Sequence, residues 1–212
     1  MTDLIVARGL GKSFGSTRAL TDVNFSVRPG RIVGLIGPHG AGKTTALMAL
    51  LGPTRFDGEL AVLGLDPYVK RHQLMQDVCF IADVAVLPRW IRVAQLIDFV
   101  AATHPRFRRE VCEHFLARSD IRKASRVREL SKGMVTQLHL ALVMAIDAKL
   151  LVLDEPTLGL DILMRKQFYE TLLNEYFDEQ RTILVTTHQV EEIEHILTDL
   201  LFIDRGRIVL DA

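Results

Sequence analysis

A glycine-rich segment, GPHGAGKTT at residues 37–45, constrains the fold of this 212-residue chain more than any other stretch. It follows the apolar run 31–36 and precedes the apolar-periodic stretch 46–51, so it stands at a strand–loop–helix junction. Glycines let the backbone of such a loop turn its N–H groups toward an anion, and the helix that follows contributes the positive end of its dipole. The segment therefore predicts a site for the phosphates of a nucleoside triphosphate.

Two side chains of this loop have specific expected roles. Lys43 is spaced to reach the β- and γ-phosphates, and the hydroxyl of Thr44 is placed to ligate Mg²⁺. The residues predicted to surround the nucleotide here are Gly37, Pro38, His39, Gly40, Ala41, Gly42, Lys43, Thr44 and Thr45. The alternative is a glycine-rich turn before an ordinary helix, which the four motif elements in register disfavour.

The composition of the chain limits which partners and which cellular compartment are expected for the protein. Apolar residues make up 49% of the chain, and Lys plus Arg equal Asp plus Glu at 26 each, so the formal net charge is +0. Because proteins that bind nucleic acid usually carry a basic excess, nucleic acid is not an expected partner. No apolar run reaches the roughly 18 residues that cross a bilayer, and the N-terminus does not read as a signal peptide. Cys79 and Cys112 are isolated and fit reduced thiols of a cytoplasmic protein.

Short apolar runs alternate with helical patterns, which indicates an α/β fold with a mostly parallel sheet. The expected strands span 4–7, 19–27, 31–36, 58–62, 78–81, 150–154, 182–186, 200–204 and 207–210. The expected helices span 44–51, 93–101, 109–117, 132–146, 162–177 and 190–196. The first strands and 58–62 favour a small antiparallel layer. We expect one domain, 1–212, in which 1–83 and 148–212 form the β layer and the core, 84–147 forms an inserted helical subdomain, and no accessory domain follows.

Two adjacent acids follow an apolar run in the sequence LLVLDEP at 150–156. Because adjacent side chains at the end of a strand point to different places, the two carboxylates are expected to have different tasks. We expect Asp154 to hold Mg²⁺, directly or through water, opposite the phosphate loop. Glu155 is expected to polarise the attacking water as a general base. A solvated strand end before a proline turn is the alternative, which the presence of the phosphate loop disfavours.

The sequence LSKGM at 130–134 resembles the signature LSGGQ of the ATP-binding subunits of ABC transporters. Together with the phosphate loop and the acidic strand, it makes essentially the whole chain similar to that family. The resemblance implies a RecA-like P-loop core and a signature that contacts ATP held by a second subunit. The signature residues are Ser131, Lys132, Gly133 and Met134, of which the second and fourth replace the usual glycine and glutamine. A helix N-cap alone would also explain the serine.

The resemblance assigns roles to four further residues. Asp161 matches the loop that crosses the dimer interface, and it is also placed to cap the next helix. His188 matches the switch histidine that contacts the γ-phosphate. Phe14 matches the aromatic residue that stacks on adenine, with a core phenylalanine as the alternative. His39 stands where the family often has asparagine and is expected to contribute its backbone rather than its ring.

Two segments depart from the family pattern or leave its interpretation open. The glutamine that links the γ-phosphate to the membrane partner corresponds to Asp83, whose carboxylate can ligate Mg²⁺ but cannot donate a hydrogen bond as an amide does. Further on, Trp90 stands between Arg89 and Arg92. This tryptophan fits either a groove that receives the membrane subunit or a core position with solvated flanks.

The resemblance implies a complete mechanism. Two subunits, expected to be identical, pack head to tail and enclose two ATP–Mg²⁺ between the loop of one and the signature of the other. Hydrolysis opens the dimer, and an integral membrane permease on a separate chain converts this motion into transport. The ATPase is then peripheral on the cytoplasmic face of the inner membrane, and the form of the signature favours export. The alternatives are an ABC ATPase that acts on ribosomes or DNA and a regulatory module that hydrolyses little.

Overall fold

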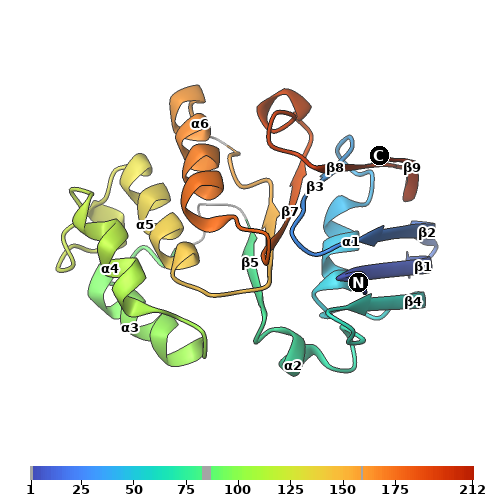
Figure 1. Ribbon diagram of the computed structural model, residues 1–212, viewed down its shortest axis with the longest axis horizontal. Coiled ribbons are helices and arrows are strands. Elements are labelled where there is room, and N and C mark those ends of the chain that lie inside the picture. Colours follow the sequence, from blue (N-terminus) through green and yellow to red (C-terminus); the bar gives the residue numbers. More distant parts are fainter. Residues whose placement is uncertain (1, 83–86, 159) are drawn as a thin grey trace.

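The computed structural model describes residues 2–82, 87–158 and 160–212, which form two β-sheets and the helices around them (Figure 1). Within these residues the larger sheet has 6 strands in the order β5-β6-β7-β3-β8-β9, parallel except for β9. The smaller sheet is antiparallel, in the order β2-β1-β4. The strands are β1 Ile5–Phe14, β2 Thr17–Val27, β3 Ile32–Ile36, β4 Asp57–Val62, β5 Val78–Ala82, β6 Leu150–Asp154, β7 Thr182–Thr187, β8 Asp199–Asp204 and β9 Arg207–Asp211.

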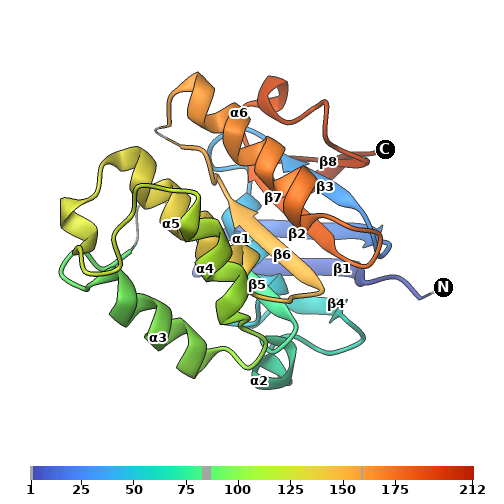
Figure 2. The ribbon, with the colours of Figure 1, turned by 60° about the vertical axis from the view of Figure 1, so that its left-hand side comes forward.

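Helices cover both faces of the larger sheet (Figures 1 and 2). On one face α1 packs between the two sheets, and on the other face lie α5 and α6. The helices are α1 Lys43–Leu50, α2 Arg71–Leu74, α3 Val93–Thr103, α4 Arg109–Ala117, α5 Lys132–Met144 and α6 Ile162–Thr171. Short 3₁₀-helices span Val127–Glu129 (η1) and Val190–Glu192 (η3), and a short π-helix spans Leu172–Tyr176 (η2). None of the helices in the described part of the chain has the length and apolar character that a membrane span requires.

The inner strands β3, β6 and β7 of the larger sheet are buried on both faces, which explains their nearly continuous apolar sequences. In β3, Val33 and Leu35 belong to the core shared with α1 and the smaller sheet. Ile32 and Ile36 belong to the core shared with α5 and α6. Because successive side chains of a strand point to opposite faces, one strand supplies both cores alternately. The predicted α/β fold and its small antiparallel layer are confirmed.

The helices between residues 93 and 144 pack around a core of their own. Ile97 of α3, Cys112 of α4 and Leu138 of α5 are all buried in this third cluster. In both ribbon views these helices lie on the side of the larger sheet away from the smaller one (Figures 1 and 2). The division of the chain at 84–147 stays a prediction, and the first residues of that range lie outside the described part.

The first strand is longer than the expected range 4–7, because two glycines hide its continuation. β1 runs to Phe14 with irregular pairing to β2 between Ala7 and Leu10. At this irregularity Gly9 has a φ of +58°, and its N–H donates to Asn24 Oδ1 at 2.7 Å. Glycine tolerates this left-handed backbone, so the strand continues past a position that reads as a turn.

Two expected helices differ from the structure. The range expected at 190–196 contains only η3 followed by turns, since the side chain of Glu192 is bonded inward to Thr157 and Arg165. So short a segment has little helical stability of its own. The helix expected at 162–177 is helical to Tyr176, but its last turn is a π-helix rather than an α-helix. The hydroxyl of Tyr176 in this turn is buried and donates to the carbonyl oxygen of Ile146 at 3.3 Å.

Both cysteines are free and buried, and we expect them to be inert in the folded protein. Burial raises the pKa of the Cys79 thiol to about 12 and that of Cys112 to about 11, so both remain protonated at about pH 8. Because the thiolate is the reacting form, a maleimide should label neither cysteine in the native protein and both after unfolding in guanidinium chloride. Mass spectrometry checks this, and rapid labelling of the native protein would contradict it.

Candidate functional site

The phosphate loop joins the end of β3 to the start of α1, as the sequence predicts. A Cβ at Gly37 would lie 2.1 Å from the carbonyl oxygen of Ile203 in β8. At Gly42, whose φ is +112°, a Cβ would lie 2.9 Å from the carbonyl oxygen of Ala19 in β2. Glycine is therefore required at both positions by close backbone approach, and at the second also by its left-handed conformation. The backbone of the loop is held tightly against two strands.

Lys43 lies at the centre of the loop, and its side chain is only 7% exposed. Its Nζ donates to the carbonyl oxygens of Gly37 at 2.6 Å and Pro38 at 3.3 Å, and lies 3.6 Å from Glu155 Oε1. A cavity of about 230 Å³ opens at this point, lined by Pro38, His39, Gly40, Ala41, Lys43, Thr44, Asp154, Glu155 and Leu158. We call it the phosphate-loop cavity. An ammonium group with three donors at its wall suits an anionic ligand.

The neighbouring parallel strands β6 and β7 place Asp154 beside Thr186. Thr186 Oγ1 donates to Asp154 Oδ1 at 2.5 Å, and Thr44 Oγ1 lies 3.5 Å from Oδ2. The structure thus brings together the two residues that the sequence predicts as magnesium ligands. Hydroxyl and carboxylate oxygens are the donors that Mg²⁺ prefers, so this pair fits that ion. Among the described residues, no group of three or more His, Cys, Asp or Glu forms a competing metal site.

The side chain of Glu155 has different partners from that of its neighbour Asp154, although both residues also bond to Thr186. Its Oε2 lies 2.9 Å from His188 Nδ1, and its N–H donates to the carbonyl oxygen of Thr186 at 3.1 Å. Its φ of +47° is left-handed, a conformation that costs free energy for any residue with a side chain. Such strain persists only where surrounding contacts fix the backbone. Here it accompanies a carboxylate held between Lys43 and His188.

The signature residues lie at the start of α5. Ser131 caps this helix, because its Oγ accepts a hydrogen bond from the backbone N–H of Met134 at 3.2 Å. A Cβ at Gly133 would lie 2.5 Å from Cε of Met164, so α5 and α6 approach closely there. The capping alternative for Ser131 is therefore present in the structure, and its role as a signature residue stays a prediction.

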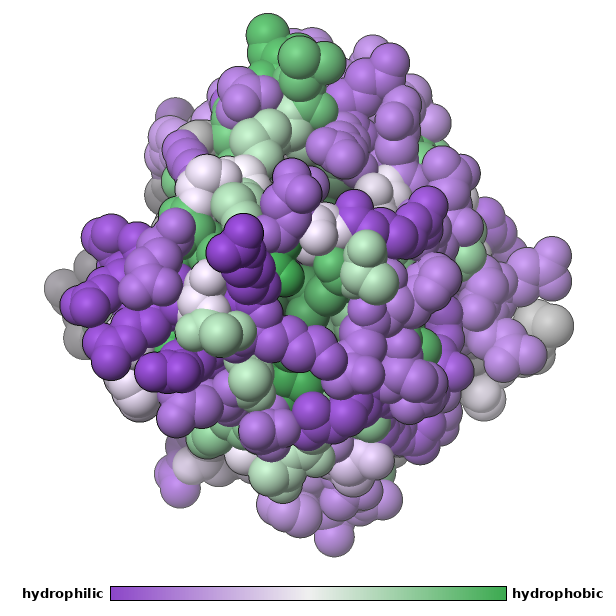
Figure 3. All heavy atoms as spheres, turned by 90° about the vertical axis from the view of Figure 1, so that its left-hand side faces the viewer, coloured by the Kyte–Doolittle hydropathy of each residue, from purple (hydrophilic) through white to green (hydrophobic). Residues whose placement is uncertain are grey.

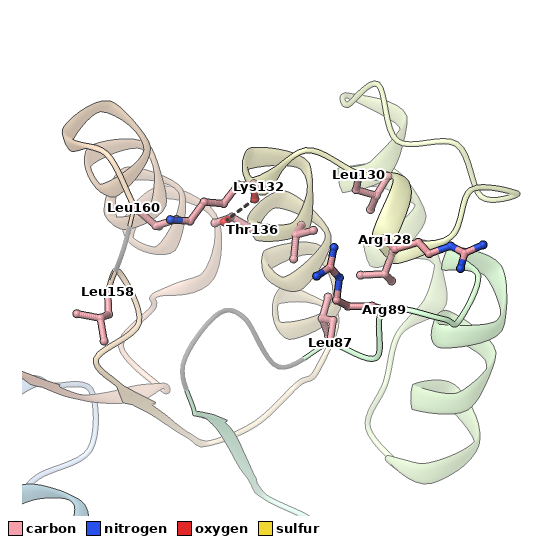
Figure 4. Close-up of a pocket in the computed structure, with 10 residues that line it drawn as sticks. Leu87, Arg89, Arg128, Leu130, Lys132, Thr136, Leu158 and Leu160 are labelled. Atoms are coloured by element: carbon pink, nitrogen blue, oxygen red, sulfur yellow. Dashed lines mark hydrogen bonds between the residues drawn. The ribbon is translucent and has the colours of Figure 1, made fainter.

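Lys132 borders a second cavity, of about 330 Å³, and extends toward Leu160 across it (Figure 4). The residues around this signature cavity are Leu87, Arg89, Val127, Arg128, Leu130, Lys132, Val135, Thr136, Leu158 and Leu160. In the described part of the chain, the four signature residues do not line the phosphate-loop cavity. Leu158 borders both cavities, but the four signature residues and the residues that line the phosphate-loop cavity are two distinct sets.

Asp161 caps α6, as expected: its Oδ1 accepts a hydrogen bond from the N–H of Met164 at 2.9 Å. Its predicted role at a dimer interface stays a prediction, and Gly159 in the same loop lies outside the described residues. Asp83, the predicted replacement for the family's glutamine, also lies outside them, so its place as a metal ligand is not described.

The aromatic alternatives left open by the sequence are decided by exposure. Phe14 ends β1 with 54% of its surface exposed, and Lys12 Nζ lies 4.9 Å from the centre of its ring. Trp90 is 70% exposed. The core interpretation is therefore wrong for both residues, because each ring lies on the surface. Neither residue lines the phosphate-loop cavity among the residues described.

Sequence reasoning missed Arg165, which ties together two loops beside the site. Its Nε donates to the carbonyl oxygen of Leu160 at 2.8 Å, and its Nη1 donates to Gln189 Oε1 at 2.7 Å and pairs with Glu192. It thus connects the loop before α6 with the segment after His188. The sequence also gave no indication of the role of Thr186, whose hydroxyl bonds to Asp154. No local pattern marks these residues, because their partners are distant in sequence.

A strand–loop–helix phosphate loop, a buried lysine within it and an acidic strand end beside it define a P-loop nucleoside triphosphatase. Sequence comparison identifies the family within this class of P-loop proteins. The protein-family model described as ABC transporter matches residues 20–158. The chain is 32% identical to Nod factor export ATP-binding protein I of Cupriavidus metallidurans, over 100% of this chain and 72% of that protein. It is 29% identical to ABC transporter ATP-binding protein YtrB of Bacillus subtilis, over 95% of this chain and 69% of that protein.

Solved structures agree on the fold. The ATP binding subunit of an ABC transporter superposes with a TM-score of 0.87 at 23% identity, covering 99% of this chain and 89% of the other. The cbiO1 protein of Clostridium perfringens, part of the ABC transporter complex cbiONQ, gives a TM-score of 0.84 at 21% identity and covers 100% of this chain and 89% of its own. The chain belongs to the ABC transporter family, in which it is an ATP-binding subunit that hydrolyses ATP.

Proposed function

We propose that this ATPase works as a head-to-tail homodimer and powers export through a membrane subunit on a separate chain. The observation that carries the proposal is the separation of the phosphate-loop cavity from the signature residues within one chain. A second copy in the opposite orientation supplies the missing half of each site. Within this scheme, the helices between 93 and 144 form a subdomain that presents the signature to that second copy.

The residues around the phosphate-loop cavity divide the work of hydrolysis. Lys43 and the N–H groups of the loop bind the β- and γ-phosphates. Thr44 and Asp154 hold Mg²⁺, which when bound neutralises charge on the phosphate oxygens. Glu155 accepts the proton of the attacking water, and His188 holds the carboxylate through the 2.9 Å contact. The strained backbone at Glu155 keeps its carboxylate on the Lys43 side of the site.

Exposed apolar side chains support a partner surface beside the signature. Figure 3 shows hydrophobic side chains gathered at the upper edge of the face that carries the helices. At the start of α6, which reaches the top of the molecule in Figure 1, Ile162 and Leu163 are 84% and 80% exposed. They directly follow Asp161, and exposed apolar groups of this kind suit a contact with another protein surface.

The remaining assignments follow the same scheme. Phe14 stacks on adenine with its exposed ring, and Asp83 ligates Mg²⁺ or a water near the γ-phosphate. Trp90, flanked by Arg89 and Arg92, contacts the membrane subunit, since exposed Trp and Arg are typical of interface centres. The export direction is supported by the names of relatives such as Nod factor export ATP-binding protein I. The ATPase then lies on the cytoplasmic face of the membrane.

Replacing Ser131 by Asp separates helix capping from phosphate binding. Aspartate caps helices as well as serine does, so α5 should keep its stability. Its negative charge should repel the γ-phosphate that a second copy presents. In the Glu155→Gln background, which slows hydrolysis, the Ser131→Asp variant should bind ATP as a monomer, whereas Glu155→Gln alone should form a dimer. Light scattering with ATP and Mg²⁺ measures this difference.

The matched control is Ser26→Asp in the same background, because Ser26 is exposed on β2 of the smaller sheet. It should dimerise like the parent. Dimer formation by Ser131→Asp would show that this serine only caps the helix.

A further inference from the structure

His39 borders the phosphate-loop cavity, where the backbone of the loop and Lys43 are the groups predicted to bind phosphate. It occupies the second position of a tight turn, closed by a hydrogen bond from the N–H of Ala41 to the carbonyl oxygen of Pro38 at 3.2 Å. The third position is Gly40, with a φ of +77°. This is the pattern of a type II turn, in which glycine takes the left-handed position. The turn therefore fixes where the imidazole of His39 leaves the backbone.

The ring of His39 packs against the ring of His188. Their centroids are 4.4 Å apart and their planes are tilted by 42°. The two residues are far apart in sequence, one in the loop between β3 and α1 and the other directly after β7. They meet because β3 and β7 are neighbouring parallel strands, whose carboxyl ends lie at the same edge of the sheet.

This contact adds a restraint that the hydrogen bond of His188 does not supply. The 2.9 Å contact between His188 Nδ1 and Glu155 Oε2 fixes one ring nitrogen. One hydrogen bond to a ring nitrogen still allows the imidazole of His188 to rotate about that bond. The ring of His39 limits this rotation, because aromatic rings in contact have preferred relative orientations and separating them costs free energy.

We propose that His39 is a positioning residue that holds the ring of His188 in the orientation in which it meets Glu155. The inference rests on the proposed role of His188 in hydrolysis. His39 then supports kcat rather than ATP affinity, and its ring acts by packing rather than by proton transfer. This departs from the expectation that His39 contributes only its backbone.

A double-mutant cycle on the full chain tests this proposal. We expect His39→Ala to lower kcat by about tenfold, in line with the coupling typical of side chains in contact, and to leave the KM for ATP within about twofold. In a His188→Ala background the same substitution should change kcat by less than about twofold, since the ring it positions is gone. His39→Phe should restore most of kcat, because phenylalanine supplies a flat ring without titratable nitrogens.

The other outcomes overturn the proposal. An unchanged kcat for His39→Ala, a raised KM with an unchanged kcat, or equal losses in both backgrounds would each remove the positioning role. Failure of His39→Phe to recover activity would assign chemistry to the imidazole instead. The control His72→Ala changes an exposed histidine on α2 and should keep full activity. Full activity of His188→Ala would reject the proposed function itself, which separates the two failures.

Discussion

Glu155→Gln should lower kcat for ATP hydrolysis by about 10²–10⁴-fold while ATP still binds. The amide has nearly the same shape and still reaches His188, but it cannot accept the proton of the attacking water. It also removes the negative charge 3.6 Å from Lys43 Nζ, so the site becomes more favourable for an anion. Nucleotide should therefore persist unhydrolysed, and size-exclusion chromatography with ATP and Mg²⁺ should show a dimer.

Glu191→Gln is the matched control. It makes the same change of charge at an exposed glutamate that does not line the phosphate-loop cavity. It should leave both kcat and the elution volume unchanged. Retention of more than about a tenth of wild-type kcat in Glu155→Gln would exclude Glu155 as the general base. A Glu155→Gln variant that stays monomeric at saturating ATP would count against the shared sites.

Lys43→Ala should weaken ATP binding by roughly 30-fold to several thousand-fold. This range corresponds to the loss of about 2–5 kcal/mol when one partner of a buried charge pair is removed. The side chain of Lys43 is 7% exposed and already points into the loop, so water would replace it poorly as a phosphate ligand. Calorimetric titration with ATP measures the change in Kd.

Lys166→Ala controls for the loss of a positive charge, because Lys166 lies exposed on α6 in an ion pair with Glu170. It should change the Kd for ATP by less than about twofold, as exposed pairs contribute little. Thermal unfolding of Lys43→Ala without nucleotide verifies that the fold is retained. An unchanged Kd in that variant would refute the placement of the phosphates at this loop.

Local signals in the sequence correctly predicted much of the fold. The apolar runs at 31–36, 150–154 and 182–186 became buried parallel strands, because a strand covered on both faces needs apolar residues at most positions. The buried polar exceptions Thr182 and Thr186 are hydrogen-bonded. Errors arose where local and tertiary signals disagree. β1 continues through Gly9 because Asn24 on the next strand satisfies its N–H, which no pattern within 4–7 reveals. The segment 190–196 is apolar-periodic, but contacts of Glu192 with other elements replace helix formation.

The candidate site divides in the same way. The caps at Ser131 and Asp161 were predictable because their hydrogen bonds join residues three positions apart. The phosphate loop was predictable because its motif is a run of consecutive residues. The exposure of Phe14 and Trp90 could not be predicted, since the sequence around an aromatic residue does not show whether its ring lies in the core or on the surface.

By itself the sequence determined the class of chemistry, because nine consecutive residues at 37–45 carry the backbone and side-chain groups that bind phosphate. The tertiary structure alone decided which distant groups complete the site. Thr186 holds Asp154, and His39 packs on His188, because β6, β7 and β3 lie side by side in that order. Strand order depends on how the helices pack over the sheet. A buried strand has the same apolar sequence beside any neighbour, so its sequence cannot specify which one it pairs with.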